Sequence, residues 1–354
     1  MNAAAKNYDG LNKYIRITDI DEASSSYTDK DIVSPDGVLT DNYLVNNRDI
    51  LLARTGASTG KSYLYKKSDG KLYYAGFLIR ANVTTHDPYF VFSQLHTHRY
   101  WRWVSIMSAR SGQPGINSQE YSSFPIYTTS IEEESKIAKL LSLLDERIAT
   151  QSKIIDKLQS LISGIVDSTI SSKSKNSTIG NVCSVSEQIR AIASIDDIIT
   201  VRLHGKGVCK SNAENLQLGS TQYYHRKAGQ LIYGKQNFHN GAIGIVPQTL
   251  NNGITSKDIP SFDINTIKCN PLYLLTQLLA PQYYKPAESL TTGTGSKRLK
   301  EDTFLKMPIV LPNKEEQDFI AVLISRITTK LNQANKLLTL FSKQKQYLLR
   351  QMFI

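Results

Sequence analysis

Basic side chains gather between Thr200 and Asn240, where Glu214 is the single acidic residue. The six cationic residues of this stretch are Arg202, Lys206, Lys210, Arg226, Lys227 and Lys235. Cationic side chains can neutralise phosphates, and amide side chains can pair with base edges in the major groove of DNA. The piece that follows a predicted strand, Lys235–Asn240, carries Gln236, Asn237 and His239. We expect this piece to contact DNA, and a solvated hairpin is the alternative.

The first half of the chain has an equivalent loop, because Arg48–Arg54 parallels Gly229–Lys235 at an offset of 181 residues. Its candidate contacts are Arg54, Thr55, Ser58 and Lys61. The string Gly56–Ser62 resembles a P-loop, but three residues separate its glycines, and a phosphate-cradling P-loop needs four. We therefore expect a turn whose backbone amides and Lys61 meet a DNA phosphate, with no nucleotide bound.

Two further loops are rich in glycine, which lets the backbone approach phosphate closely. Their candidate contacts are Arg110 and Gln113 in the first half and Lys297 and Arg298 in the second. A loop that only joins a strand to a helix is the alternative for each.

Signs of catalysis are missing from the sequence. No glycine-rich cofactor loop stands between a strand and a helix, and no Asn/Asp-Pro-Pro-aromatic signature of amino-methyltransferases is present. The six histidines show no metal or triad spacing, and the three cysteines form no CxxC pair. His96 and His98 are expected to lie on a half-buried helix surface. The sequence thus predicts no catalytic residues, no metal site and no enzyme.

Composition favours a polyanionic partner. The 354 residues carry a formal net charge of +11, with a pI of about 9.3, and 40% of them are hydrophobic. This length and hydrophobicity allow two domains with their own cores. No apolar run approaches the roughly 18 residues that would span a bilayer. We expect a cytoplasmic protein with no membrane partner.

Two long stretches with the same heptad register must position these loops. Apolar residues alternate four and three apart in both stretches, and the second copy follows the first by 183 residues. This alternation is typical of a coiled-coil seam. The predicted seam residues are Ile137, Leu141, Leu144, Ile148, Ile155, Leu158, Ile320, Ile324, Ile327, Leu331, Leu338 and Phe341. Polar residues interrupt the seam at Gln151 and Lys345, where they can fix the register.

The repeat predicts an α+β protein built by internal duplication. Two mixed α/β domains, residues 1–127 and 178–312, are each followed by a long helix, in residues 128–177 and 313–354. Ser130 and Asn313 are the expected N-caps, with glutamates in each first turn. Expected strands include Tyr14–Ile17, Asp49–Ala53, Phe77–Ala81 and Pro125–Tyr127 in the first domain, and Gly229–Tyr233, Ala242–Val246 and Pro308–Val310 in the second. Expected shorter helices cover Tyr89–Ser105 and Pro271–Ala280.

This order of domains and helices resembles the specificity subunit of type I restriction–modification enzymes. The resemblance covers essentially the whole chain. It rests on the helix openings Glu132–Ser142 and Glu315–Ser325 and on the strand motifs Tyr14–Ile20 and Asp49–Gly56. It implies that each mixed domain is a target recognition domain reading one half of a split double-stranded DNA sequence. The two helices would pair as an antiparallel coiled coil and set the spacing, with Ile162 and Ile165 lying toward Ile320 and Ile324.

The resemblance also implies partners. The subunit would recruit two methyltransferase (modification) subunits and further motor–nuclease (restriction) subunits. S-adenosylmethionine, ATP and Mg would belong to those partners, and none would be bound by this chain. Two alternatives stay open: a coiled-coil scaffold that reads no sequence, and an inactive partial specificity cassette. The partial cassette is considered because the segments before the first expected strands differ in length. In the first domain 13 residues precede Tyr14, whereas in the second about 20 residues separate the Ser/Lys-rich linker from Ile198. We therefore expect the first domain to be incomplete at its beginning.

Overall fold

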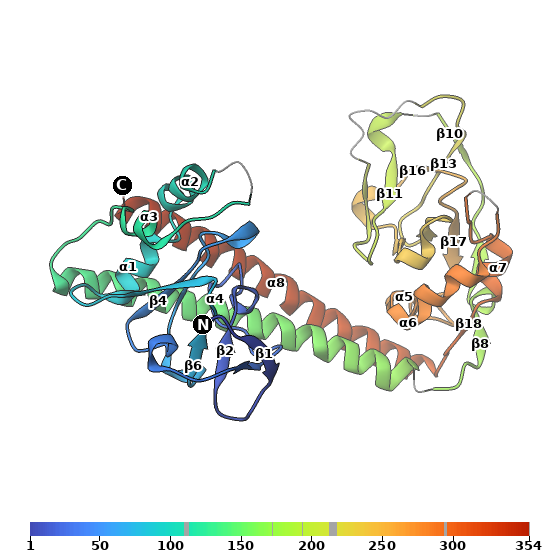
Figure 1. Ribbon diagram of the computed structural model, residues 1–354. Helices are drawn as coiled ribbons and strands as arrows, with labels where there is room; N and C mark the ends of the chain where they lie inside the picture. The colour runs from blue at the N-terminus through green and yellow to red at the C-terminus, as the bar shows by residue number, and fades with distance from the viewer. Residues whose placement is uncertain (110–112, 172, 193, 212–217, 294–295, 354) are drawn as a thin grey trace. The chain divides into compact units, whose positions relative to one another are not determined.

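The computed structural model describes residues 1–109, 113–171, 173–192, 194–211, 218–293 and 296–353. It divides into two compact units. The first unit comprises Met1–Ile155 and Ala334–Ile354, and the second comprises Asp156–Gln333. Each unit combines small sheets, short helices and a piece of both long helices, as labelled in Figure 1. The predicted α+β class is confirmed. Among the described residues, the helices include none that is both long and apolar enough to cross a membrane.

The long helices are α4 (Ile131–Val166) and α8 (Lys314–Met352). Both begin at the expected N-caps: the amide of Glu133 donates to Ser130 Oγ at 3.3 Å, and the amide of Glu316 donates to Asn313 Oδ1 at 2.9 Å. Five residues after α4, Asp167–Ser171, form a π-helical turn that ends the helical run.

Within each unit the two helices pack antiparallel. In the first unit, Ala138 and Leu141 of α4 share a buried cluster with Leu349 and Phe353 near the end of α8. In the second unit, Val166 at the end of α4 is buried with Ile320 and Ile324 near the start of α8. Ile162 and Ile165 pack against the same cluster. Every position of the four-three pattern is buried or half-buried, which is the burial expected of a coiled-coil seam.

The two polar seam residues have partners inside the first unit. Gln151 donates its side-chain amide to the carbonyl of Ala334 at 3.2 Å. Lys345, 17% exposed, forms an ion pair with Asp145 at 2.6 Å, and the hydroxyl of Tyr89 donates to the same carboxylate. Partners of this kind tie the register of the helices to each other and to the globular part.

The first unit centres on a three-stranded antiparallel sheet in the order β5-β4-β7. Two smaller pairings accompany it, β2 with β6 in parallel and β1 with β3. The strands are β1 (Ala4–Asn7), β2 (Lys13–Ile15), β3 (Val33–Asp36), β4 (Asp49–Ala53), β5 (Ser62–Leu64), β6 (Leu72–Tyr74) and β7 (Leu78–Asn82), and the short helices are α1 (Pro88–Gln94), α2 (His98–Met107) and α3 (Ser118–Ser122).

The predicted single helix Tyr89–Ser105 is wrong, because the chain breaks between α1 and α2. Thr97 makes the break: its hydroxyl donates to the carbonyl of Gln94 at 2.7 Å and accepts the amide of Tyr100 at 3.3 Å. Thr97 is therefore the N-cap of a new helix, a role that its side chain favours over a helix interior.

The second unit centres on a four-stranded antiparallel sheet in the order β15-β14-β17-β9. Three smaller sheets surround it: β10-β13-β16, β11-β12 and β18-β8. The strands are β8 (Ser177–Thr178), β9 (Cys183–Val185), β10 (Arg190–Ala191), β11 (Ile199–Val201), β12 (Val208–Lys210), β13 (Tyr223–His225), β14 (Leu231–Tyr233), β15 (Ile243–Ile245), β16 (Ile254–Ser256), β17 (Ser261–Ile264) and β18 (Pro308–Ile309), and the short helices are α5 (Pro271–Leu278), α6 (Pro281–Tyr284) and α7 (Glu301–Lys306).

The duplication holds at the level of single contacts. In the first unit, the amide of Gln94 bonds both the N–H and the C=O of Tyr127, at 2.7 and 2.9 Å. At an offset of 183, Gln277 does the same to Val310, at 2.7 and 3.1 Å. The predicted strand Pro125–Tyr127 is nevertheless wrong, because none of the described strands pairs with it, whereas β18 pairs with β8.

Candidate nucleic-acid interface

The loop after β14 exposes the amide side chains that the sequence singled out. Tyr233 and Phe238 anchor its two ends in the core, with ring centroids 5.4 Å apart. Gly241 closes the turn at φ 72°, a left-handed conformation that suits glycine. Because both ends are held, Gln236 and Asn237 are exposed on the turn between them.

A hairpin lies directly beside this turn. The loop joining β11 to β12 donates two backbone hydrogen bonds, from His204 to the carbonyl of Asn240 at 2.8 Å and from Gly205 to that of Gly241 at 3.0 Å. Arg202 and Lys206 flank these contacts and are exposed. Lys210 is exposed at the far end of the hairpin, where its residue pairs with Ile199.

A third loop adjoins the same turn. The amide of Leu299 donates to the carbonyl of Lys235 at 2.9 Å, which places Lys297 and Arg298 next to it. The basic residues here have acidic partners. The pairs are Lys235–Glu301 at 2.9 Å, Lys297–Glu288 at 3.4 Å and Arg298–Asp258 at 3.2 Å. We call residues 202–206, 235–240 and 297–298 the second loop surface.

The first unit builds the same junction from different side chains. The amide of Ile116 donates to the carbonyl of Arg54 at 2.9 Å, as Leu299 does to Lys235, and Thr55 forms a bridge with Gly115. Arg54 and Gln113 are exposed, and Ser58 is half-buried. We call residues 54–58 and 113–116 the first loop surface. Arg110 lies outside the described residues.

Lys61 and the P-loop-like string form a packed turn. A Cβ on Gly60 would lie 2.8 Å from Val104 Cγ1, and the carbonyl of Gly60 accepts the hydroxyl of Tyr100 at 2.8 Å. Only glycine allows so close an approach of the backbone to α2. Lys61 is 19% exposed and pairs with Glu22 at 3.3 Å, so a phosphate contact by Lys61, which stays a prediction, would have to displace Glu22.

Comparison with known proteins finds a family match in the first part of the chain. Residues 1–160 match the family described as "Type I restriction modification DNA specificity domain". The chain is similar to the type I restriction enzyme MjaVIII specificity subunit of Methanocaldococcus jannaschii, with 22% identity over 308 residues, which cover 78% of this chain and 72% of the relative. The first part of this chain is thus similar to type I specificity domains.

A solved structure shares the fold of this chain. It is the crystal structure of the type I restriction–modification system S subunit from M. genitalium, with a TM-score of 0.62 and 14% sequence identity. The alignment covers 98% of this chain and 89% of that one. The likeness extends over both units, so the shared fold is not confined to the residues that match the family description.

One basic residue of the second unit is not on the surface. Arg226 is fully buried, and its guanidinium donates to Thr255 Oγ1 at 2.7 Å, to Ser261 Oγ at 3.0 Å and to the carbonyl of Ile259 at 3.2 Å. Burial lowers the pKa of Arg226 to about 10. The sequence composition does not indicate that Arg226 is buried while Arg202 is exposed.

The surroundings of His96 decide its protonation state. His96 is half-buried, with its ring nitrogens at 3.0 Å from the carbonyl of Phe92 and from Ser25 Oγ. Burial, helped by the charge of Lys345, lowers the pKa of His96 to about 4, which keeps it neutral at physiological pH. Over the part of the chain that the structure describes, no three His, Cys, Asp or Glu side chains are grouped to hold a metal ion.

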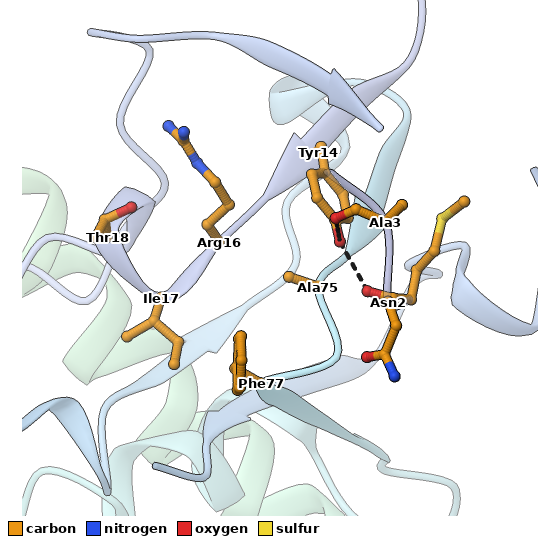
Figure 2. Close-up of a pocket in the computed structure, with 9 residues that line it drawn as sticks. Asn2, Ala3, Tyr14, Arg16, Ile17, Thr18, Ala75 and Phe77 are labelled. Atoms are coloured by element: carbon orange, nitrogen blue, oxygen red, sulfur yellow. Dashed lines mark hydrogen bonds between the residues drawn. The ribbon is translucent and has the colours of Figure 1, made fainter. Parts of the chain in front are cut away.

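The first unit has a pocket of about 760 Å³, and none of the predicted DNA-contacting residues lines it. Figure 2 shows its lining, in which the hydroxyl of Tyr14 is directed at the N-terminal segment and donates to the carbonyl of Met1 at 2.7 Å. Arg16, its charged lining residue, is paired with Asp19 at 2.8 Å. The loop surfaces therefore remain the candidate interface.

Proposed function

We propose that this chain is a specificity subunit that reads a bipartite double-stranded DNA target, with each unit recognising one half through its loop surface. The observation that carries the proposal is that duplicated backbone junctions present different side chains. The same backbone hydrogen bond joins Ile116 to Arg54 and Leu299 to Lys235. A shared backbone structure with different exposed side chains suits two domains that recognise different DNA sequences.

The exposed groups on each surface are suited to base and phosphate contacts. Gln236 and Asn237 can accept and donate at once, as adenine recognition in the major groove requires. Arg54 in the first unit can pair with two acceptors of guanine. Arg202 and Lys206 sit beside the second turn as phosphate contacts, which would fix orientation without reading sequence.

We further propose that the antiparallel helices set the distance between the half-sites. Duplication within one chain gives pseudo-symmetry, so two equivalent docking places are available for two methyltransferase (modification) subunits, and motor–nuclease (restriction) subunits would join that complex. S-adenosylmethionine, ATP and Mg would be bound by those partners. Methyl transfer and DNA cleavage would likewise belong to them.

A scaffold that reads no sequence is the second candidate function. Such a scaffold needs the helix pairing but not the exposed amides of Gln236 and Asn237. A partial cassette is the third, and it is favoured by one difference: the second unit has a fourth sheet strand, β9, that the described sheet of the first unit lacks. In that case the second unit alone would read DNA.

Sequencing of methylated bases in cells that carry this chain and its cognate methyltransferase subunit tests these proposals. We expect adenine methylation at a two-part motif with a fixed gap. Replacing residues 178–312 by the corresponding domain of another specificity subunit should change one half of the motif and leave the other unchanged. A swap that changes both halves would contradict independent reading, and a motif without a second half would favour the partial cassette.

A further inference from the structure

Arg298 of the second loop surface is held by its backbone and by its side chain. Its amide donates to the carbonyl of Thr292 at 2.9 Å, and its carbonyl accepts the amide of Thr292 at 3.0 Å. Its guanidinium meets both oxygens of one carboxylate: Nη1 lies 3.2 Å from Asp258 Oδ1, and Nη2 donates to Asp258 Oδ2 at 3.5 Å. Two such contacts fix the plane of a guanidinium as well as its position. The Arg298 side chain is nevertheless 46% exposed, so part of its fork remains accessible.

The carboxylate that holds Arg298 is itself firmly placed. Asp258 lies in the turn between β16 and β17, where its carbonyl accepts the amide of Lys235 at 2.9 Å and its own amide donates to Ser256 Oγ at 3.3 Å. The fully buried Arg226 holds this turn from the core side, because its guanidinium donates to the carbonyl of Ile259 at 3.2 Å. Asp258 is therefore a fixed support between the core and the second loop surface.

The two lysines of the same surface are held differently. Lys235 is half-buried and contacts Glu301 at 2.9 Å, whereas Lys297 is exposed and contacts Glu288 at 3.4 Å. A lysine presents one nitrogen, which acts as a point charge toward a phosphate. A guanidinium is a planar fork that matches two acceptors at once. Of these three cations, Arg298 is the one whose geometry suits a base.

The first unit keeps the backbone of this arrangement but not the charged pair. At an offset of 181, Asp258 corresponds to Phe77, and the carbonyl of Phe77 accepts the amide of Arg54 at 3.1 Å. At an offset of 183, Arg298 corresponds to Gly115. Both members of the ion pair are therefore replaced in the other copy, although the hydrogen bond beside them is retained. Such a joint difference is expected of two side chains that serve the DNA sequence of one unit only.

We propose that Asp258 is a positioning residue that presents Arg298 to a guanine in the half-site read by the second unit, an inference that rests on the proposed function. A guanidinium has five N–H donors, so the two that face Asp258 leave enough to pair with O6 and N7 of guanine. Because the carboxylate fixes the fork before DNA arrives, less side-chain freedom is lost on binding.

The charge of Asp258 favours the same conclusion. A carboxylate next to DNA repels phosphates, so the pair weakens general attraction to DNA while it keeps the arginine aimed. Asp258 thus raises the difference in affinity between a half-site that has the guanine and one that lacks it.

The test uses the complex with the methyltransferase subunit and duplexes of its own motif. In each duplex, 7-deazaguanine, which lacks the N7 acceptor, replaces one guanine of the half-site that the exchange of residues 178–312 alters. With the unmodified chain, we expect one such replacement to weaken binding about tenfold by fluorescence anisotropy, as loss of half of a bidentate contact requires. With Asp258→Asn the same replacement should weaken binding less than about threefold. Arg298→Lys keeps the charge but not the fork, and should lose the sensitivity as well.

Two controls separate positioning from folding. Glu288→Gln removes a negative charge from the neighbouring Lys297 pair and should keep the full sensitivity to 7-deazaguanine. Asp258→Asn should leave the unfolding midpoint unchanged, because exposed ion pairs contribute little to stability. Its affinity for a duplex without the motif should not fall, because the substitution removes a negative charge.

Two results would overturn the proposal and leave the proposed function standing. The first is an equal effect of 7-deazaguanine on the unmodified chain and on Asp258→Asn. The second is a half-site in which no guanine replacement weakens binding of the unmodified chain. A complex that prefers no motif at all would instead contradict the proposed function and, with it, this inference.

Discussion

Replacing Glu134 should loosen the first unit at the point where α1 meets α4. The Glu134 side chain is fully buried and accepts three hydrogen bonds, from His86 Nδ1 at 2.8 Å, from the amide of Asp87 at 2.9 Å and from that of Thr129 at 3.4 Å. Gln317 is the counterpart in the second unit, and its Oε1 accepts the amide of Asn270 at 2.8 Å. The same junction is thus built once with a carboxylate and once with an amide.

The expected cost follows from these contacts. Hydrogen bonds to charged groups contribute about 1.5–3 kcal/mol each, and an unsatisfied buried amide adds to the loss, so Glu134→Ala should cost about 3–4 kcal/mol. For a unit of this size 1 kcal/mol corresponds to about 2–4 °C, which predicts a midpoint lowered by roughly 6–16 °C. Glu134→Gln keeps an acceptor for the amide of Asp87, and we expect it to cost less than about 1.5 kcal/mol.

Tryptophan fluorescence measures this effect in one unit alone, because the two tryptophans, Trp101 and Trp103, both lie in α2. The matched control, Gln317→Ala, should lower the transition of the second unit seen by circular dichroism and leave the tryptophan midpoint within about 2 °C, since its lost contacts lie in that unit. The reasoning is refuted if Glu134→Ala leaves the tryptophan midpoint unchanged, or if Glu134→Gln is as damaging as Glu134→Ala.

Three further predictions concern charge. The double variant Arg202→Ala, Lys206→Ala should weaken DNA binding by the methyltransferase complex and reduce the slope of log K against log salt by about 2, as removal of two phosphate contacts requires; an unchanged slope would remove both residues from the interface. Because the pKa of His96 is about 4 in the fold and 6.5 when unfolded, the unfolded state binds the proton first as pH falls. The free energy of unfolding of the first unit should therefore fall by about 2 kcal/mol between pH 7.5 and pH 5. Urea unfolding followed by tryptophan fluorescence measures this loss, which the variant His96→Gln should not show. Lys345→Met leaves the carboxylate of Asp145 without its cation and should lower the free energy of unfolding by about 3 kcal/mol. The double variant with Asp145→Leu should recover most of this loss. Equal unfolding midpoints for the single and double variants would argue against a buried ion pair.

The helices and their pairing could be predicted from the sequence because heptad spacing and N-caps are local signals. Ser130 and Asn313 begin the helices as expected, and the antiparallel packing brings Ile162 and Ile165 to Ile320 and Ile324. The short helices were harder, because Thr97 ends α1 through a side-chain hydrogen bond that spacing does not reveal.

The candidate contacts depended on tertiary structure that sequence patterns do not carry. The loop around His204 meets Asn240 through backbone hydrogen bonds, which no side-chain pattern encodes. Arg226 and Arg202 look alike in composition, yet one is fully buried. Pro125–Tyr127 matched a strand pattern, but a strand also needs a partner, and β8 supplies one only in the second unit.

The most direct test of the central claim is the gap in the methylated motif after the helices are lengthened. One heptad would be inserted in each helix, after Ile155 in α4 and after Gln333 in α8, so that the four-three register continues. Seven residues lengthen a helix by about 10.5 Å, or about three base pairs of DNA at 3.4 Å each. We predict that methylome sequencing finds both half-sites unchanged and a gap about three base pairs wider. A gap of unchanged width with full methylation would contradict the account.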